Sequence, residues 1–397
     1  MNILISNHLT SSQATGIYEY SALLRTVGPW VEKGGAIAIC YVVFSTCLGF
    51  CILIPQFLQP AFSEMFGIER FPFDQQMYIL LAMPMFLWPL CLLRDLSSLR
   101  FSSIIGIVAI FYCLGLFVYE SIHHHDIGEA PGTASDPEAE FVSMEWSVGI
   151  FIVVNVASKA NVCHYSLPPI YESLRDRSVK RMWIVMAASY SIVTVIYVVF
   201  AFCGYYLFGT DSQGNVLENF GGDSGAAVSV ARVGTAFSIF GCFPLIFKAG
   251  INALESQFFS EPDSRWNFEE NPRVRVTVIT VILAVLTLIS LFLDDIGPVS
   301  SIEGAVTVLL LICAFPILIY WKVRFGGGSG RDRMGSHGQM EMTSYRMMGD
   351  GVEESPTHGM PLESSRTANV QKIGLGVLFV LGTGLGIAGM TMSMTIL

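Results

Sequence analysis

Few residues of this chain could do chemistry, and the most informative of them interrupt an apolar segment. The segment 147–174 contains the polar run Ser-Lys-Ala-Asn-Val-Cys-His at 158–164, and two prolines follow it. An unbroken helix over that segment would be about 42 Å long, and proline fits only the first turn of a helix. The sequence therefore predicts a half-helix, an unwound stretch and a second half-helix from about Ser166. In the alternative interpretation, the helix ends at His164 and a loop follows.

An unwound stretch inside a membrane would point to a binding cavity. Irregular backbone survives at membrane depth only where protein or a watery cavity satisfies its polar groups. Lys159 would then be a charge costing several kcal/mol unless it is paired or functional. It could neutralise a substrate carboxylate or take the place of a coupling cation; otherwise it extends to the membrane interface. His164 could titrate and gate transport, or it could be a capping or loop histidine.

Two charged residues in other apolar segments are further candidates. Glu303 is the only carboxylate well inside a predicted span, 299–321, and a membrane carboxylate is a typical proton carrier. Its position about five residues from the span's end also allows a wet vestibule. Arg232, in the span 226–251, could pair with Glu303. The sequence shows no phosphate loop, metal-ligand spacing or nucleophile elbow, so we expect neither an enzyme nor a cofactor.

The elements that position these residues follow from the composition. Of 397 residues, 52% are hydrophobic and 14% are charged, which is typical of an all-α polytopic membrane protein. Nine stretches are long enough to span a bilayer: 35–57, 77–94, 101–120, 147–174 (interrupted), 183–207, 226–251, 274–293, 299–321 and 372–394. They divide the chain into a cytosolic segment 1–34, a core of eight helices at 35–321, a disordered cytosolic loop at 322–371, and a last helix with a short tail at 372–397.

The charges in the loops predict the orientation, and the cysteines and a histidine run give two further expectations. Most of the 22 lysines and arginines fall on one side of the nine spans, which places the N-terminus in the cytosol. All nine cysteines lie in apolar segments, which is typical of packing residues and not of a disulfide framework. The acidic loop 121–146 contains the run His123–His125, which could bind a metal weakly or simply be solvated.

Several motifs occur in an order that indicates a known family. Residues 89–100 are PLCLLRDLSSLR, residues 162–174 are VCHYSLPPIYESL, residues 177–182 are RSVKRM and residues 204–209 are GYYLFG. In this order and spacing they resemble the amino acid/auxin permease family, which includes sodium-coupled neutral and vacuolar amino acid transporters. The resemblance covers about residues 40–325.

The resemblance implies a fold and a site. The family has a leucine-transporter-like inverted-repeat fold of eleven helices, with the substrate between unwound stretches of the first and sixth helices. Carried over, the substrate-binding residues are Ser158, Lys159, Ala160, Asn161, Cys163, His164 and Ser166. The coupling-ion candidates are Glu303, Lys159 and Arg232. The first two helices of the family pattern have no counterpart, so either the annotated start of the chain is wrong or this is a short or degenerate form.

The coupling ion and the function are expectations from the same resemblance. Sodium-coupled members carry threonines where this chain has Phe240 and Cys242, so a proton is preferred over sodium. We expect a proton-coupled secondary transporter of amino acids, working by alternating access in the plasma membrane or a vacuolar or lysosomal membrane. Its partners would be the amino acid, the proton and the lipid bilayer, with no nucleic acid. The alternative is a non-transporting amino acid sensor or partner subunit.

Overall fold

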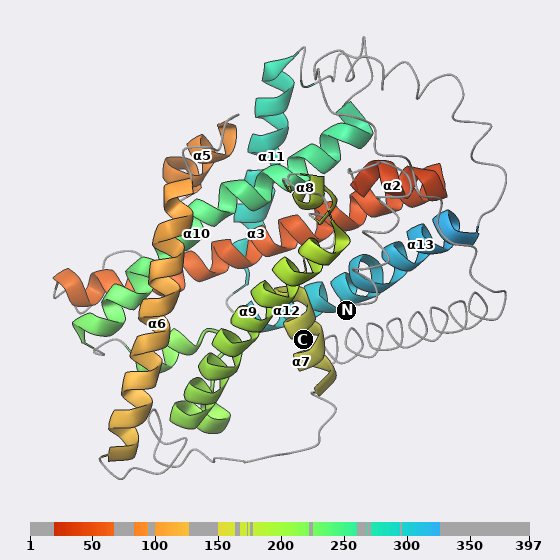
Figure 1. Cartoon of the computed structure of the whole chain (residues 1–397). Coiled ribbons are helices and arrows are strands. Elements are labelled where there is room, and N and C mark those ends of the chain that lie inside the picture. Colours follow the sequence, from red (N-terminus) through yellow and green to blue (C-terminus); the bar gives the residue numbers. More distant parts are fainter. Residues whose placement is uncertain are drawn as a thin grey trace.

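The computed structural model describes a set of helices that pack against one another (Figure 1). The described residues are 20–66, 83–93, 100–126, 150–162, 167–172, 174, 178–221, 225–259, 268, 271–293 and 296–325. The main helices are α2 (Tyr20–Val27), α3 (Pro29–Phe66), α5 (Trp88–Leu92), α6 (Arg100–Asp126), α7 (Ile150–Ala160), α8 (Leu167–Glu172), α9 (Val179–Phe208), α10 (Ala226–Leu254), α11 (Pro272–Ser290), α12 (Ile296–Val306) and α13 (Phe315–Phe325). Within these ranges the structure contains no strand.

Six of the described helices are long and apolar enough to cross a membrane. They correspond to six of the nine expected spans, and most run a few residues longer than the apolar stretch that predicts them. Of the other three, 147–174 contains only the short α7 and α8, and 77–94 is described only as the π-helical turn η1 (Met83–Leu87) and α5. The last span, 372–394, and residues 326–371 lie outside the described residues.

The core is built on the pair α3 and α10, which run side by side and pack more extensively than any other pair (Figure 1). A helix of 38 residues, such as α3, is about 57 Å long, well beyond the roughly 30 Å of a bilayer core. Gly250 of α10 makes the close crossing possible, because a Cβ there would lie 2.8 Å from Val43 of α3. Aromatic side chains fill the remaining space, with Phe44 and Phe247 at a ring-centroid distance of 5.6 Å.

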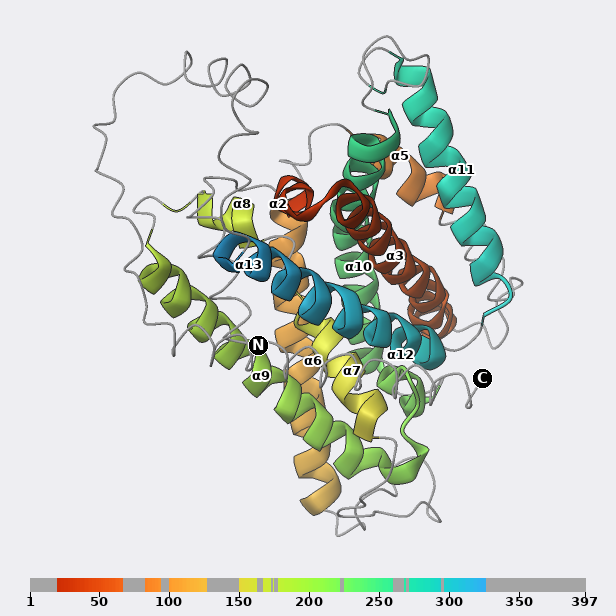
Figure 2. The same cartoon turned by 90° about the vertical axis from the view of Figure 1, so that its right-hand side faces the viewer.

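A second assembly of helices lies against this core. Helix α12, the π-helical segment η7 (Thr307–Ala314) and α13 follow one another without a break, and Figure 2 shows them as one long helix crossing α7. Helix α12 packs on both α7 and α3. Gly304 brings α7 and α12 together, since a Cβ at this position would lie only 2.7 Å from the backbone oxygen of Asn155. Two of the three charged candidates of the sequence, Lys159 and Glu303, are on these two helices.

The prediction for the cysteines agrees with the structure, but the loop position predicted for the histidine run does not. The eight described cysteines are free, and all but the half-buried Cys242 are buried, which confirms their role as packing residues. The histidine run, by contrast, is not in a loop, because α6 continues to Asp126. His124 is buried and meets the ring of Tyr206 edge-on at 6.1 Å. Among the described residues, no group of three or more His, Cys, Asp or Glu could hold a metal ion.

Candidate functional site

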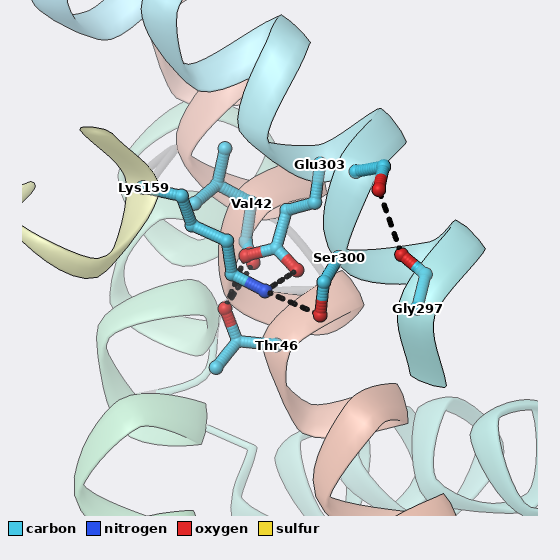
Figure 3. Close-up of polar contacts among 7 residues, drawn as sticks. Val42, Thr46, Lys159, Gly297, Ser300 and Glu303 are labelled. Atoms are coloured by element: carbon cyan, nitrogen blue, oxygen red, sulfur yellow. Dashed lines mark hydrogen bonds and ion pairs between the residues drawn. The ribbon is translucent and has the colours of Figure 1, made fainter. Parts of the chain in front are cut away.

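A buried ion pair joins α7 to α12. The Nζ of Lys159 lies 2.8 Å from the Oε2 of Glu303, and the Glu303 side chain is completely buried (Figure 3). Lys159 occupies the last turn of α7, where the partial negative charge of the helix C-terminus favours a cation. Each charge therefore compensates the other in a place where an isolated charge would be costly. Of the two alternatives left open for Glu303, the wet vestibule does not fit, because its side chain has no exposed surface.

The second carboxylate oxygen of Glu303 contacts the core helix α3. The hydroxyl of Thr46 lies 2.5 Å from Oε1 of Glu303 and also 2.9 Å from the carbonyl oxygen of Val42 in its own helix. A hydroxyl has one proton to donate but can also accept. Thr46 can therefore donate to Glu303 when the carboxylate is ionised. When Glu303 is protonated, Thr46 can accept its proton in a hydrogen bond and donate to Val42 instead.

A serine of α12 completes the surroundings of the ammonium group. The Nζ of Lys159 donates a long hydrogen bond of 3.4 Å to the Oγ of Ser300, one helical turn before Glu303 (Figure 3). The adjacent Ser301 has a different role, because its hydroxyl donates to the carbonyl of Gly297 in the same helix at 2.9 Å. Of these two serines, Ser300 alone serves the ion pair.

The chain turns away from the helical path directly after Lys159. Helix α7 ends at Ala160, the N–H groups of Asn161 and Val162 bond back to the carbonyls of Ser158 and Lys159, and the next helix begins only at Leu167. Tyr190 of α9 donates to the carbonyl of Asn161 at 2.9 Å. The helix is thus interrupted within the run that the sequence singles out, and it ends before His164. Residues 163–166, and with them Cys163, His164 and Ser166, lie outside the described residues.

Arg232 is placed elsewhere. It is 1% exposed and donates through Nη2 to the carbonyl oxygens of Leu217 and Gly221, at 2.9 and 2.6 Å. These carbonyls belong to the 3-10 helix η5 (Val216–Phe220) and the glycine that ends it, in the connection between α9 and α10. The expected pairing of Arg232 with Glu303 is therefore wrong. The partner of Glu303 is Lys159.

The sequence points to both members of the ion pair but not to their contact or to Thr46. Ser300 lies three residues before Glu303, a spacing that places both on one helical face and was a usable signal. Thr46, in contrast, lies in a long apolar helix with nothing in its neighbourhood to distinguish it. Only the packing of α3 against α12 brings it to Glu303.

Comparisons with known proteins place this arrangement in context. A family profile described as "Transmembrane amino acid transporter protein" matches residues 1–326. Amino acid transporter AVT6E of Arabidopsis thaliana is 29% identical over 255 residues, which cover 62% of this chain and 50% of that protein. Sodium-coupled neutral amino acid transporter 7 of Xenopus laevis is 27% identical over 310 residues, 75% of this chain and 65% of that protein. The chain thus spans about half to two thirds of the length of these two relatives.

Proposed function

The chain belongs to the transmembrane amino acid transporter family, and from this premise we propose that it carries amino acids across a membrane by proton-coupled secondary active transport. The observation that supports coupling most directly is the buried pair of Lys159 and Glu303, 2.8 Å apart. An ionisable residue inside a membrane span is usually part of an ion or substrate pathway. Here two of them, of opposite sign, meet beside the end of an interrupted helix.

In this proposal the substrate carboxylate and Glu303 compete for one ammonium group. An amino acid that binds beside the end of α7 presents its carboxylate to Lys159, on the last turn of that helix. Glu303 then loses its counter-charge and takes up a proton, because a lone carboxylate in a completely buried position is costly. Neither Lys159 nor Glu303 then carries an unpaired charge in either state. Substrate binding and proton binding are coupled for that reason.

Thr46 can stabilise the protonated state of Glu303. The neutral carboxyl of Glu303 has a proton to donate, and the oxygen of Thr46 at 2.5 Å can accept it. The Thr46 hydroxyl then donates to the Val42 carbonyl, which lies 2.9 Å away. The proton of the neutral carboxyl and the hydrogen of the Thr46 hydroxyl therefore both have an acceptor.

The same exchange provides a way to move α7. The ion pair joins α7 to α12, and the Thr46 contact joins α12 to the core helix α3. When the substrate takes Lys159, the electrostatic link between α7 and α12 is lost, while the link between α12 and α3 remains. Movement of α7 relative to a fixed α3–α10 core would be the alternating-access step.

The test uses the full chain reconstituted in liposomes, with mixed radiolabelled amino acids and an imposed pH gradient. Accumulation should follow the gradient in the unaltered protein and fall to the level of empty liposomes in Glu303→Gln, which fixes the residue in a neutral form. Exchange of labelled for unlabelled amino acid needs no net proton movement and should persist in Glu303→Gln. Ser301→Ala, whose hydroxyl bonds only within α12, is the matched control and should accumulate normally.

Two results would contradict the proposal in different ways. Gradient-driven accumulation that is undiminished in Glu303→Gln would remove this carboxylate from proton coupling. Saturable amino acid binding with neither accumulation nor exchange under any gradient would argue against transport altogether and favour an amino acid receptor.

A further inference from the structure

The ammonium group of Lys159 lies among oxygen atoms of the kind that bind hard metal cations. The Oε2 of Glu303 lies 2.8 Å from it, and the Oγ of Ser300 lies at 3.4 Å. Thr46 adds a hydroxyl oxygen next to the same carboxylate. Carboxylate and hydroxyl oxygens are the ligands that hard cations select. The arrangement comes from helices that lie far apart in sequence, α3 and α12, and Figure 3 shows the lysine reaching it from α7.

A further hydroxyl oxygen, that of Thr307, follows directly after α12 on the same helical face. Thr307 is completely buried, and its hydroxyl has no hydrogen-bond partner among the described residues. It follows Glu303 by four residues, and Ser300 precedes Glu303 by three, so all three lie along one helical face. Thr307 also begins the π-helical segment η7, and π-helical turns within α-helices occur often at functional sites. A buried hydroxyl without a partner needs an explanation, and a bound ion or water is one that fits a position beside a carboxylate.

We propose that Ser300 and Glu303 of α12, Thr307 of η7 and Thr46 of α3 form a site for a small monovalent cation. The Lys159 ammonium fills this site, so that Lys159 determines the ion specificity of the transporter. With the ammonium in place, sodium has neither the space nor the free negative charge to bind. A proton needs only a lone pair on Glu303 and no added space. Lys159 therefore closes this position to sodium, while Glu303 can still take up a proton once the substrate carboxylate has drawn the ammonium away.

This inference rests on the proposed function only in its consequence for coupling, because cation binding itself can be measured without transport. Replacing Lys159 by a small residue empties the position and leaves Glu303 without a counter-charge. Sodium or lithium should then bind where the ammonium was. The change would turn a protein that is indifferent to sodium into one that sodium stabilises.

The experiment measures the melting temperature of the purified full chain in detergent, with sodium, lithium or N-methylglucamine chloride at constant ionic strength. Lys159→Ala should melt at a temperature that rises saturably with sodium or lithium but not with N-methylglucamine. The unaltered protein and the control Lys248→Ala, which removes a lysine of α10, should show no such rise. Adding Glu303→Gln to Lys159→Ala should abolish the effect, and adding Thr307→Val should weaken apparent sodium affinity about tenfold.

The pH dependence gives a second, independent measurement. Sodium and a proton compete for the same carboxylate, so the stabilisation of Lys159→Ala by sodium should be large near pH 8 and shrink as the pH falls. Tyr41 and Cys47 of α3 also lie near Glu303, but a phenol and a buried thiol stay neutral below about pH 8. They would not produce this dependence.

The proposal is overturned by any of three results. The first is a folded Lys159→Ala protein without cation-specific stabilisation at any pH. The second is a stabilisation that survives the added Glu303→Gln. The third is aggregation of both Lys159→Ala and Lys159→Ser in sodium as well as in N-methylglucamine, because sodium should restore the missing charge. None of these results bears on whether the unaltered protein uses a pH gradient, so the transport proposal stands or falls on its own test.

Discussion

In the described part of the chain, Lys159 and Arg232 carry positive charge into the helical core, and the two charges are compensated in different ways. Lys159 meets the carboxylate of Glu303, which can gain or lose a proton. Arg232 meets the backbone carbonyls of Leu217 and Gly221, which cannot. The carboxylates of Glu64 and Glu218 act on Arg232 electrostatically, but its hydrogen bonds go to the backbone. The first cation can therefore exchange its partner, whereas the second holds a fixed loop.

The surroundings of the two cations agree with this division. Lys159 is 20% exposed on the last turn of a short helix, next to the point where the helix ends. Arg232 is 1% exposed in the interior of α10, a helix that packs along α3 for much of its length. A charge that must change partners needs access, and Lys159, in the last turn of α7, has it. A charge that fixes a loop does not need it.

The largest effect should come from removing the fixed charge. Arg232→Met keeps the apolar stem but leaves the carbonyls of Leu217 and Gly221 without their donor, which should cost about 2–5 kcal/mol of folding free energy. We expect a fall in melting temperature of several degrees and faster proteolysis between α9 and α10. The loss should depend less on pH than that of Lys159→Met, because the hydrogen-bond partners of Arg232 are carbonyl oxygens, which do not titrate. An equal or larger pH dependence would place Arg232 in the same class as Lys159.

The next largest effect on stability concerns the ion pair of Lys159 and Glu303, whose two charges can be removed together. Lys159→Met or Glu303→Gln alone leaves one buried charge or dipole unmatched and should cost about 3 kcal/mol. The double variant removes both charges and should recover most of that loss, since a buried ion pair replaced by neutral groups is often nearly as stable. Melting temperatures of the unaltered protein, the two single variants and the double variant give the coupling energy between Lys159 and Glu303. Additive losses would show that the two side chains do not interact in the folded protein.

The sequence alone indicates the family and much of the helical framework. Family membership and the all-α membrane character are confirmed, because long apolar segments such as that of α9 need only length and hydropathy to be recognised. The interruption after Lys159 was also visible, since a polar run followed by two prolines cannot continue a helix. Sequence patterns of this kind are enough to predict a helix or its end, because these depend only on residues within about 20 positions of one another.

Contacts between distant helices could not be predicted in the same way. Arg232 and Glu303 were a plausible pair by charge and depth, but the partner of Glu303 is set by the close crossing at Gly304, which brings α7 to α12. The burial of His124 has a similar cause, because it depends on Tyr206 of another helix. One glycine or one aromatic ring decides such contacts, and nothing in the adjacent sequence indicates which partner it will meet.

The smallest expected effect tests whether the serine beside the ion pair belongs to it. Ser300→Ala removes a hydrogen bond of 3.4 Å to the Lys159 ammonium, while Ser301→Ala removes one of 2.9 Å to the carbonyl of Gly297. Either change should cost at most about 1 kcal/mol, so stability will not distinguish them. Gradient-driven uptake will, because only Ser300→Ala weakens the hold on Lys159 and should let the substrate carboxylate capture the ammonium at a lower concentration, lowering KM. An equal KM in the two variants would confine the exchangeable site to Lys159, Glu303 and Thr46.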